Sequence, residues 1–151
     1  MRILIDTNVV LDLLLAREPF VHDAARIFAN VERGEIEGLL CATTLTTVDY
    51  LLGQTLSKRE TRRAIRALLN LFGITPVNRI VLAAATDSSM LDFEDAVLAQ
   101  SANHSSVKRI VTRNTSDFPE SPIVAVDPSE FLAQFPDSAG PRDQEYGTNI
   151  Q

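Results

Sequence analysis

The sequence predicts an α/β fold, a three-layer α/β/α sandwich with a short central parallel sheet. Short continuous apolar runs, such as "RILI" at 2–5 and "RIVT" at 109–112, alternate with longer segments whose apolar residues recur every three or four positions. Strands without polar alternation are typical of a sheet that is covered on both faces. Strands that alternate with helices favour crossover connections, and these make the sheet parallel.

The first half of the chain begins with the strand at 2–5, after which capping residues predict a helix over about 8–16. A second helix follows Pro19 and ends near Gly34. The next strand is "GLLCA" at 38–42. Apolar residues at helical spacing then predict two further helices, the second stopping at Gly73, through Leu45, Val48, Leu51 and Leu52 and through Ile65, Leu68, Leu69 and Phe72.

The second half continues this alternation. "ITPV" at 74–77 predicts a strand, a helix through Val81, Leu82 and Ala85 follows, and "DFEDAVLAQSAN" from 92 predicts a helix with an acidic first turn. "RIVT" and "IVAV" at 123–126 are the last predicted strands. From Pro136 onward the composition offers almost nothing to bury, so we expect one domain over 1–135 and a disordered tail over 136–151.

Composition excludes some classes of protein. No run approaches the roughly 20 apolar residues that a membrane span needs, and we recognise no signal peptide. A single cysteine, Cys41, cannot form an internal disulfide, which suits the cytoplasm. The net charge of −6 argues against a generally basic surface, but it permits a local basic patch. An acidic excess can also come from carboxylates gathered around a divalent cation.

Carboxylates lie where the predicted sheet would gather a ligand. Asp6 ends the first strand, Asp117 lies just beyond "RIVT", and Asp92 and Asp95 begin the helix before that strand. Ligands of open parallel sheets bind beyond the carboxyl ends of the strands, so three segments can bring acids to one edge. Such acids repel one another unless a cation lies among them, and Mg²⁺ or Mn²⁺ is the usual ion for oxygen ligands.

A metal held by Asp6, Asp95 and Asp117 can bridge a phosphate and lower the pKa of a bound water. Each acid also has a simpler interpretation. Asp6 fits a helix N-cap, Asp92 and Asp95 fit a capping-box-like pair, and "TRNTSDF" fits a turn. A capping carboxylate can still bind a metal, so the two interpretations are compatible.

Three segments together resemble the PIN domain, the nuclease fold of VapC-type toxins: "ILIDTNVVLDLLL", "DFEDAVLAQSA" and "IVTRNTSDF", in the family's order over about 2–133. The resemblance implies a Mg²⁺- or Mn²⁺-dependent ribonuclease whose metal is held by Asp6, Asp95 and Asp117. It also implies the toxin of a toxin-antitoxin pair, with an RNA substrate, a cognate antitoxin and a homodimer. The positions that match supporting polar residues are Thr7, Asn8, Thr112 and Asn114.

One position departs from the family pattern. The family usually has a glutamate on the helix after the second strand, and in "CATTLTTVDYLL" its place falls on Thr47. Asp49 is the nearest acid, but two residues along a helix correspond to about 200° of rotation, so it should face away. Asp49 and Asp92 are therefore secondary candidates for metal ligands.

The missing glutamate keeps a second function open, a non-catalytic PIN-like module that binds RNA or protein. A third reading is a phosphohydrolase that uses Asp6 as a covalent nucleophile. It would need a second acid two residues further on, where the chain has Asn8, so we rank it last.

The segment "SKRETRRAIRALL" places lysine and arginine side chains on the outer face of a predicted amphipathic helix, where they are candidates for binding RNA. Such a stripe can neutralise phosphates, although it also fits a solvated face or a dimer or antitoxin surface. Arg113, beside the acids, could hold a phosphate directly. The stripe consists of Lys58, Arg59, Arg62, Arg63 and Arg66.

Overall fold

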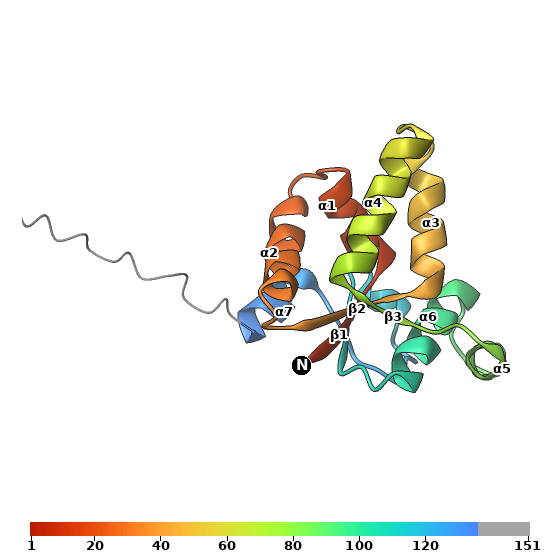
Figure 1. Ribbon diagram of the computed structural model, residues 1–151. Helices are drawn as coiled ribbons and strands as arrows, with labels where there is room; N and C mark the ends of the chain where they lie inside the picture. Colours follow the sequence, from red (N-terminus) through yellow and green to blue (C-terminus); the bar gives the residue numbers. More distant parts are fainter. Residues whose placement is uncertain (136–151) are drawn as a thin grey trace, which may run out of the picture.

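The structure, a computed structural model, describes residues 1–135 and shows an α/β fold in three layers (Figure 1). Its five strands form one parallel sheet in the order β3-β2-β1-β4-β5. The predicted α/β class and parallel sheet are thus confirmed, whereas the predicted tail at 136–151 lies outside the described residues. The strands are β1 (Arg2–Ile5), β2 (Glu37–Cys41), β3 (Gly73–Thr75), β4 (Arg109–Val111) and β5 (Ala125–Val126).

Helices cover both faces of the sheet (Figure 1). Side chains of β1 alternate between the faces, so Ile3 and Ile5 enter one core and Leu4 enters the other. The first core is covered by α1 (Thr7–Leu14), α2 (Val21–Glu32), α3 (Ala42–Leu52), α4 (Lys58–Leu71) and α7 (Pro128–Gln134). The second is covered by α5 (Arg79–Thr86) and α6 (Phe93–His104).

The sheet has its topological switch point at β1, which pairs with β2 on one side and β4 on the other. Ile5 lies opposite Val111, so the carboxyl ends of β1 and β4 are level. Connections leave these two strands in opposite directions at such a point, and a crevice opens between them. Asp6 directly follows β1 and Thr112 directly follows β4, so the first and third sequence motifs meet there.

The structure contains one helix that the sequence analysis did not predict, α7, and the turn expected in "TRNTSDF" is a 3₁₀ turn at Thr115–Asp117. The apolar period of α7 is too short to recognise, but Asp127 caps its first turn and Pro128 occupies its first position, which are the signals that could have found it. Phe131 of α7 is buried in the first core.

Several boundaries also differ from the prediction by a few residues, and two of them have a clear cause. The first helix ends at Leu14, two residues early, because the chain turns at Ala16 with a φ of 49°. β3 begins at Gly73, where a Cβ would lie 2.6 Å from the Leu39 side chain, so a larger residue here would require Leu39 to move. Within residues 1–135, no helix has the length and apolar character to cross a membrane.

Candidate functional site

Asp6 lies at the junction of β1 and α1 and is almost buried, with 8% of its surface exposed. Its backbone N–H continues the pairing with β4 by donating to Val111 O at 2.9 Å. One carboxylate oxygen accepts from Thr7 N at 2.7 Å and caps α1, and the other accepts from Thr112 Oγ1 at 2.7 Å. Burial raises the pKa of Asp6 more than these hydrogen bonds lower it.

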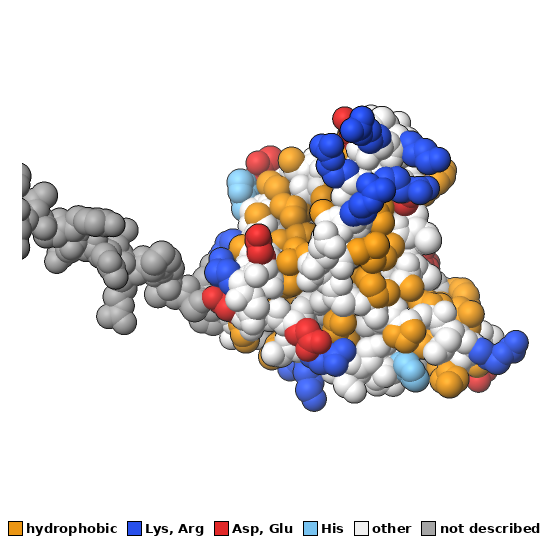
Figure 2. Space-filling view, viewed as in Figure 1, with side chains coloured by type: hydrophobic (Ala, Val, Ile, Leu, Met, Phe, Trp, Pro, Cys, Tyr) orange, Lys and Arg blue, Asp and Glu red, His pale blue; other side chains and the backbone are white. Residues whose placement is uncertain are grey.

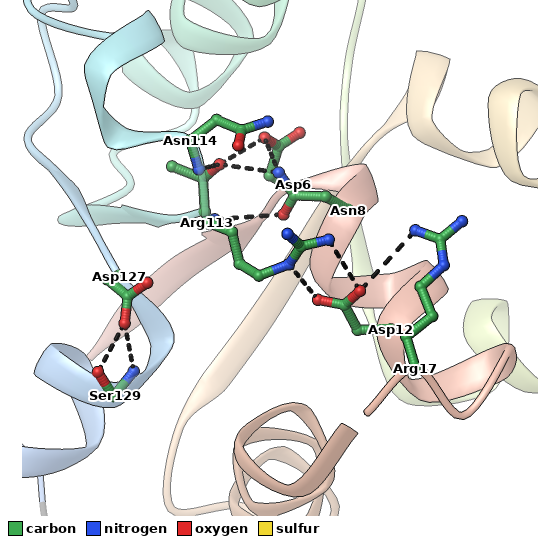
Figure 3. A network of polar contacts seen from close by, with 9 residues as sticks. Asp6, Asn8, Asp12, Arg17, Arg113, Asn114, Asp127 and Ser129 are labelled. Atoms are coloured by element: carbon green, nitrogen blue, oxygen red, sulfur yellow. Dashed lines mark hydrogen bonds and ion pairs between the residues drawn. The ribbon is translucent and has the colours of Figure 1, made fainter. Parts of the chain in front are cut away.

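Polar residues that follow β4 hold the Asp6 carboxylate in place (Figure 3). Thr112 Oγ1 donates to Asp6 and accepts from Asn8 Nδ2 at 3.2 Å and from Asn114 N at 3.1 Å. Asn8 Oδ1 in turn accepts from Arg113 N at 3.3 Å. The structure therefore brings Asn8 and Thr112 into contact with Asp6, while Thr7 Oγ1 donates to Thr44 Oγ1 of α3 at 3.1 Å.

The first turn of α6 brings further carboxylates to the same place. Asp92 caps this helix, accepting from Asp95 N at 2.9 Å, as the sequence predicts. Asp6, Asp92, Glu94 and Asp95 line one cavity between α1, α3 and α6, which we call the acidic cavity. Asp117, on the 3₁₀ turn, lines an adjoining cavity together with Asp92 and Asp95.

These carboxylates act on one another electrostatically. Partial burial and then the charge of Asp92 raise the pKa of Asp95 to about 7, with smaller contributions from Asp6, Asp117 and Glu94. Glu94 and Asp117 likewise contribute to the raised pKa of Asp6. Acids from three separate segments therefore share one local field, which a cation placed among them would reverse.

The donor chemistry of this edge fits a divalent cation. Carboxylates, hydroxyls and an asparagine side chain provide hard oxygen donors, the kind that Mg²⁺ and Mn²⁺ prefer. Nowhere in residues 1–135, however, do three acidic, histidine or cysteine side chains already lie close enough to share one ion. Asp117 and Glu94 are exposed, so their side chains have room to turn toward a cation.

Asp49 does not belong to this cluster. Its carboxylate lies 3.5 Å from Arg62 Nε and links α3 to α4, and it does not line the acidic cavity. As the helical rotation between positions 47 and 49 predicts, Asp49 faces away from the side of α3 that carries Thr47. We therefore remove Asp49 from the candidate metal ligands. Thr47, on the cavity side of α3, lies 3.3 Å from the Glu94 carboxylate.

Arg113 is occupied by a partner that the sequence analysis did not identify (Figure 3). Its Nε and Nη2 donate to the two oxygens of Asp12 at 2.5 and 3.0 Å, although the residues are 101 positions apart. The guanidinium also lies 4.0 Å from the Phe20 ring centroid. Arg113 therefore clamps the loop after β4 onto α1, and its predicted contact with a phosphate stays a prediction. The sequence does contain one signal for this pair: Asp12 is the only acid in the apolar run "VVLDLLL", and a buried acid needs a partner of opposite charge.

Arg17 is a better placed cation, and the sequence analysis missed it. Of the cavity-lining residues within 1–135 it is the only Lys or Arg, and 42% of its side chain is exposed. Its Nη1 lies 3.8 Å from Asp12, whose single charge Arg113 already neutralises. Asp12 therefore does not balance the positive charge of Arg17, which lies at the mouth of the cavity.

The predicted basic stripe exists as a surface feature. Figure 2 shows Lys and Arg side chains gathered over the end of α4 that points away from the sheet. A capping box formed by Ser57 and Glu60 begins this helix. None of the stripe residues lines the acidic cavity, so any RNA contact there would be remote from the carboxylates. All of them are exposed: Lys58, Arg59, Arg62, Arg63 and Arg66.

Comparison with known folds agrees with this geometry. The chain is similar to a chain of the FitAB complex bound to an IR36 DNA fragment, with 22% identity, a TM-score of 0.67, and coverage of 83% of this chain and 94% of that one. It is also similar to a toxin-antitoxin complex from Klebsiella pneumoniae (22%, 0.62, 83% and 96%) and to VapBC-1 from nontypeable Haemophilus influenzae (16%, 0.64, 85% and 99%). No curated protein matches the sequence.

Two features define the class of protein: a three-layer α/β/α fold, and carboxylates gathered at the switch point of its parallel sheet. The family profile described as "PIN domain" matches residues 2–116 of the chain. The chain belongs to the PIN domain family, as its three motifs indicated.

Proposed function

We propose that the protein is a Mg²⁺- or Mn²⁺-dependent ribonuclease and the toxin of a toxin-antitoxin pair. The observation that carries this proposal is the shared electrostatic field of the carboxylates at the switch point, where the pKa of Asp95 is raised to about 7. Unneutralised acids at one site are unfavourable in the free protein, and a divalent cation relieves their repulsion. Family membership supports a nuclease as the class of enzyme.

The roles of the residues follow from their positions. Asp6, Asp95 and Asp117 would hold the metal, which when bound supplies Lewis acidity and a more acidic water. Thr112 and Asn8 orient the Asp6 carboxylate through their hydrogen bonds. Arg17 binds a phosphate of the RNA at the mouth of the acidic cavity and keeps the polyanion from being repelled by the acids.

The partners proposed here come from the family and its neighbours. A similar fold occurs in a protein described as a toxin-antitoxin complex, which supports a cognate antitoxin as a partner of this chain. We further propose a homodimer, a single catalytic domain over 1–135 and action on RNA in the cytoplasm. The basic stripe on α4 is proposed as a second RNA-binding surface, which contacts phosphates and therefore binds RNA with little dependence on its sequence.

The test is titration calorimetry of Mn²⁺ together with a gel assay on a labelled single-stranded RNA pool. Wild type should bind Mn²⁺ and cut RNA, whereas Asp95→Asn should do neither. Asp49→Asn removes the same charge outside the acidic cavity and should behave as wild type.

A second candidate is a non-catalytic PIN module that binds RNA or protein. It is favoured by the finding that, in residues 1–135, no three potential ligands already surround one point. Wild type that binds the RNA pool but never cuts it, with Mg²⁺ or Mn²⁺ present, would select this candidate.

A further inference from the structure

The α3 wall of the acidic cavity is neutral. Thr43 and Thr44 line the cavity from this helix, and Thr47 follows one turn later. The acid of α3, Asp49, faces α4 and pairs with Arg62. Any negative charge on the α3 side of the cavity must therefore come from another element.

Glu94 of α6 reaches across to that wall. Its Oε1 lies 3.3 Å from Thr47 Oγ1, a contact between residues 47 positions apart. Thr47 Oγ1 also lies 3.1 Å from Thr43 O, and its single proton cannot serve both acceptors at once. The hydroxyl therefore holds the Glu94 carboxylate only weakly.

Helix capping does not account for this position. The first turn of α6 is already capped by Asp92, whose side chain accepts from Asp95 N. Asp6 and Asp95 both repel the Glu94 carboxylate. Repulsion from these acids disfavours a carboxylate in the cavity, and a cation that shared the cavity would relieve this repulsion.

We propose that Glu94 is a ligand of the divalent cation on the α3 side of the acidic cavity, where its carboxylate already lies beside Thr47. The inference rests on the proposed function, since it assigns a residue to that metal. Two carboxylates of one helical turn, Glu94 and Asp95, then face the ion together with Asp6. Glu94 of α6 thus supplies a carboxylate on the side of the cavity where α3 carries Thr47 instead of the glutamate usual in the family.

The test measures Mn²⁺ affinity by calorimetry and by electron paramagnetic resonance of free Mn²⁺, without RNA. Glu94→Gln keeps the size of the side chain and removes its charge, and it should weaken Mn²⁺ binding by about 10-fold or more. Glu120→Gln is the matched control, because Glu120 is an acid of the adjoining cavity that hydrogen-bonds Ser89. This control should bind Mn²⁺ like wild type.

A relocation experiment separates ligation from general charge. Glu94→Thr alone should lose affinity, and combining it with Thr47→Glu should recover most of the loss, because the carboxylate returns to the same cavity from α3. Thermal unfolding of every variant without metal checks that the fold is kept.

The outcomes distinguish this inference from the proposed function. If Glu94→Gln binds Mn²⁺ like wild type while Asp95→Asn does not, the assignment of Glu94 is wrong and the metal site stands. Equal weakening by Glu94→Gln and Glu120→Gln would also overturn it, because long-range charge would then explain both. If wild type binds no Mn²⁺, both proposals fail.

Discussion

The clamp between Asp12 and Arg113 can be tested by removing one charge. Asp12 is 1% exposed and receives two hydrogen bonds from the Arg113 guanidinium, so Asp12→Asn leaves that cation without its counter-charge. Breaking a buried pair in this way costs about 3–5 kcal/mol. Arg113 keeps 23% of its side chain in solvent and the amide oxygen still accepts one hydrogen bond, so we expect a loss of about 2–3 kcal/mol.

The assay is urea unfolding at pH 7 combined with a thermal scan. For a domain of this size, that loss corresponds to a fall in Tm of roughly 6–12 °C. Asp49→Asn is the control, because its pair with Arg62 is partly exposed and should contribute no more than about 1 kcal/mol. A loss below about 1 kcal/mol for Asp12→Asn would refute the reasoning, since the clamp would then not be a buried, coupled pair.

Four further predictions concern the site and the basic stripe. In metal-free protein, the raised pKa of Asp95 means that the folded state binds its proton more tightly than the unfolded state, so this contribution to stability is present below about pH 4 and is lost as pH rises toward 7. Tm should therefore fall less between pH 5 and 7.5 in Asp95→Asn than in wild type. An equal fall in both proteins would show that the raised pKa of Asp95 does not cause the loss of stability. Mn²⁺ affinity should drop as pH falls below 7, by up to about tenfold per pH unit, because the ion competes with that proton, and a pH-independent titration would exclude Asp95 as a ligand. Arg17→Ala should raise KM for RNA with little change in Tm or Mn²⁺ affinity, and Arg17→Lys should restore part of the loss; an unchanged KM would remove Arg17 from the phosphate contact. Arg59→Ala combined with Arg63→Ala should lower the slope of log affinity for RNA against log salt concentration by roughly 1–2, and an unchanged slope would assign the stripe to another partner.

The carboxylate positions show what the sequence could predict about the site. Asp6 and Asp95 were recognisable because each sits at an element boundary that hydrophobic periodicity locates, and parallel strands bring such boundaries to one edge. The capping role of Asp92 was recognisable for the same local reason. Glu94 gave no such signal, because its contact with Thr47 depends on how α6 crosses α3.

The arginines show which contacts the sequence could not predict. Arg113 follows the last motif and was taken for a phosphate ligand, but its charge is used by Asp12 from α1. Arg17 lies outside every motif and still faces the acidic cavity. A charge pattern along the chain cannot say which opposite charge a side chain meets, since the partners lie on elements that are distant in sequence.

The sequence by itself determined the order and type of most elements, the parallel sheet and the edge at which the acids meet. These features depend on local periodicity, on capping and on the geometry of strand crossovers, all of which act over a few residues. Only the tertiary structure decided that α7 packs on α2, that Arg113 is clamped by Asp12 and that Glu94 faces Thr47. The reason is physical: helix packing sets the distances between residues far apart in sequence, and at such distances burial and charge decide which carboxylates and cations pair and which remain free for a ligand.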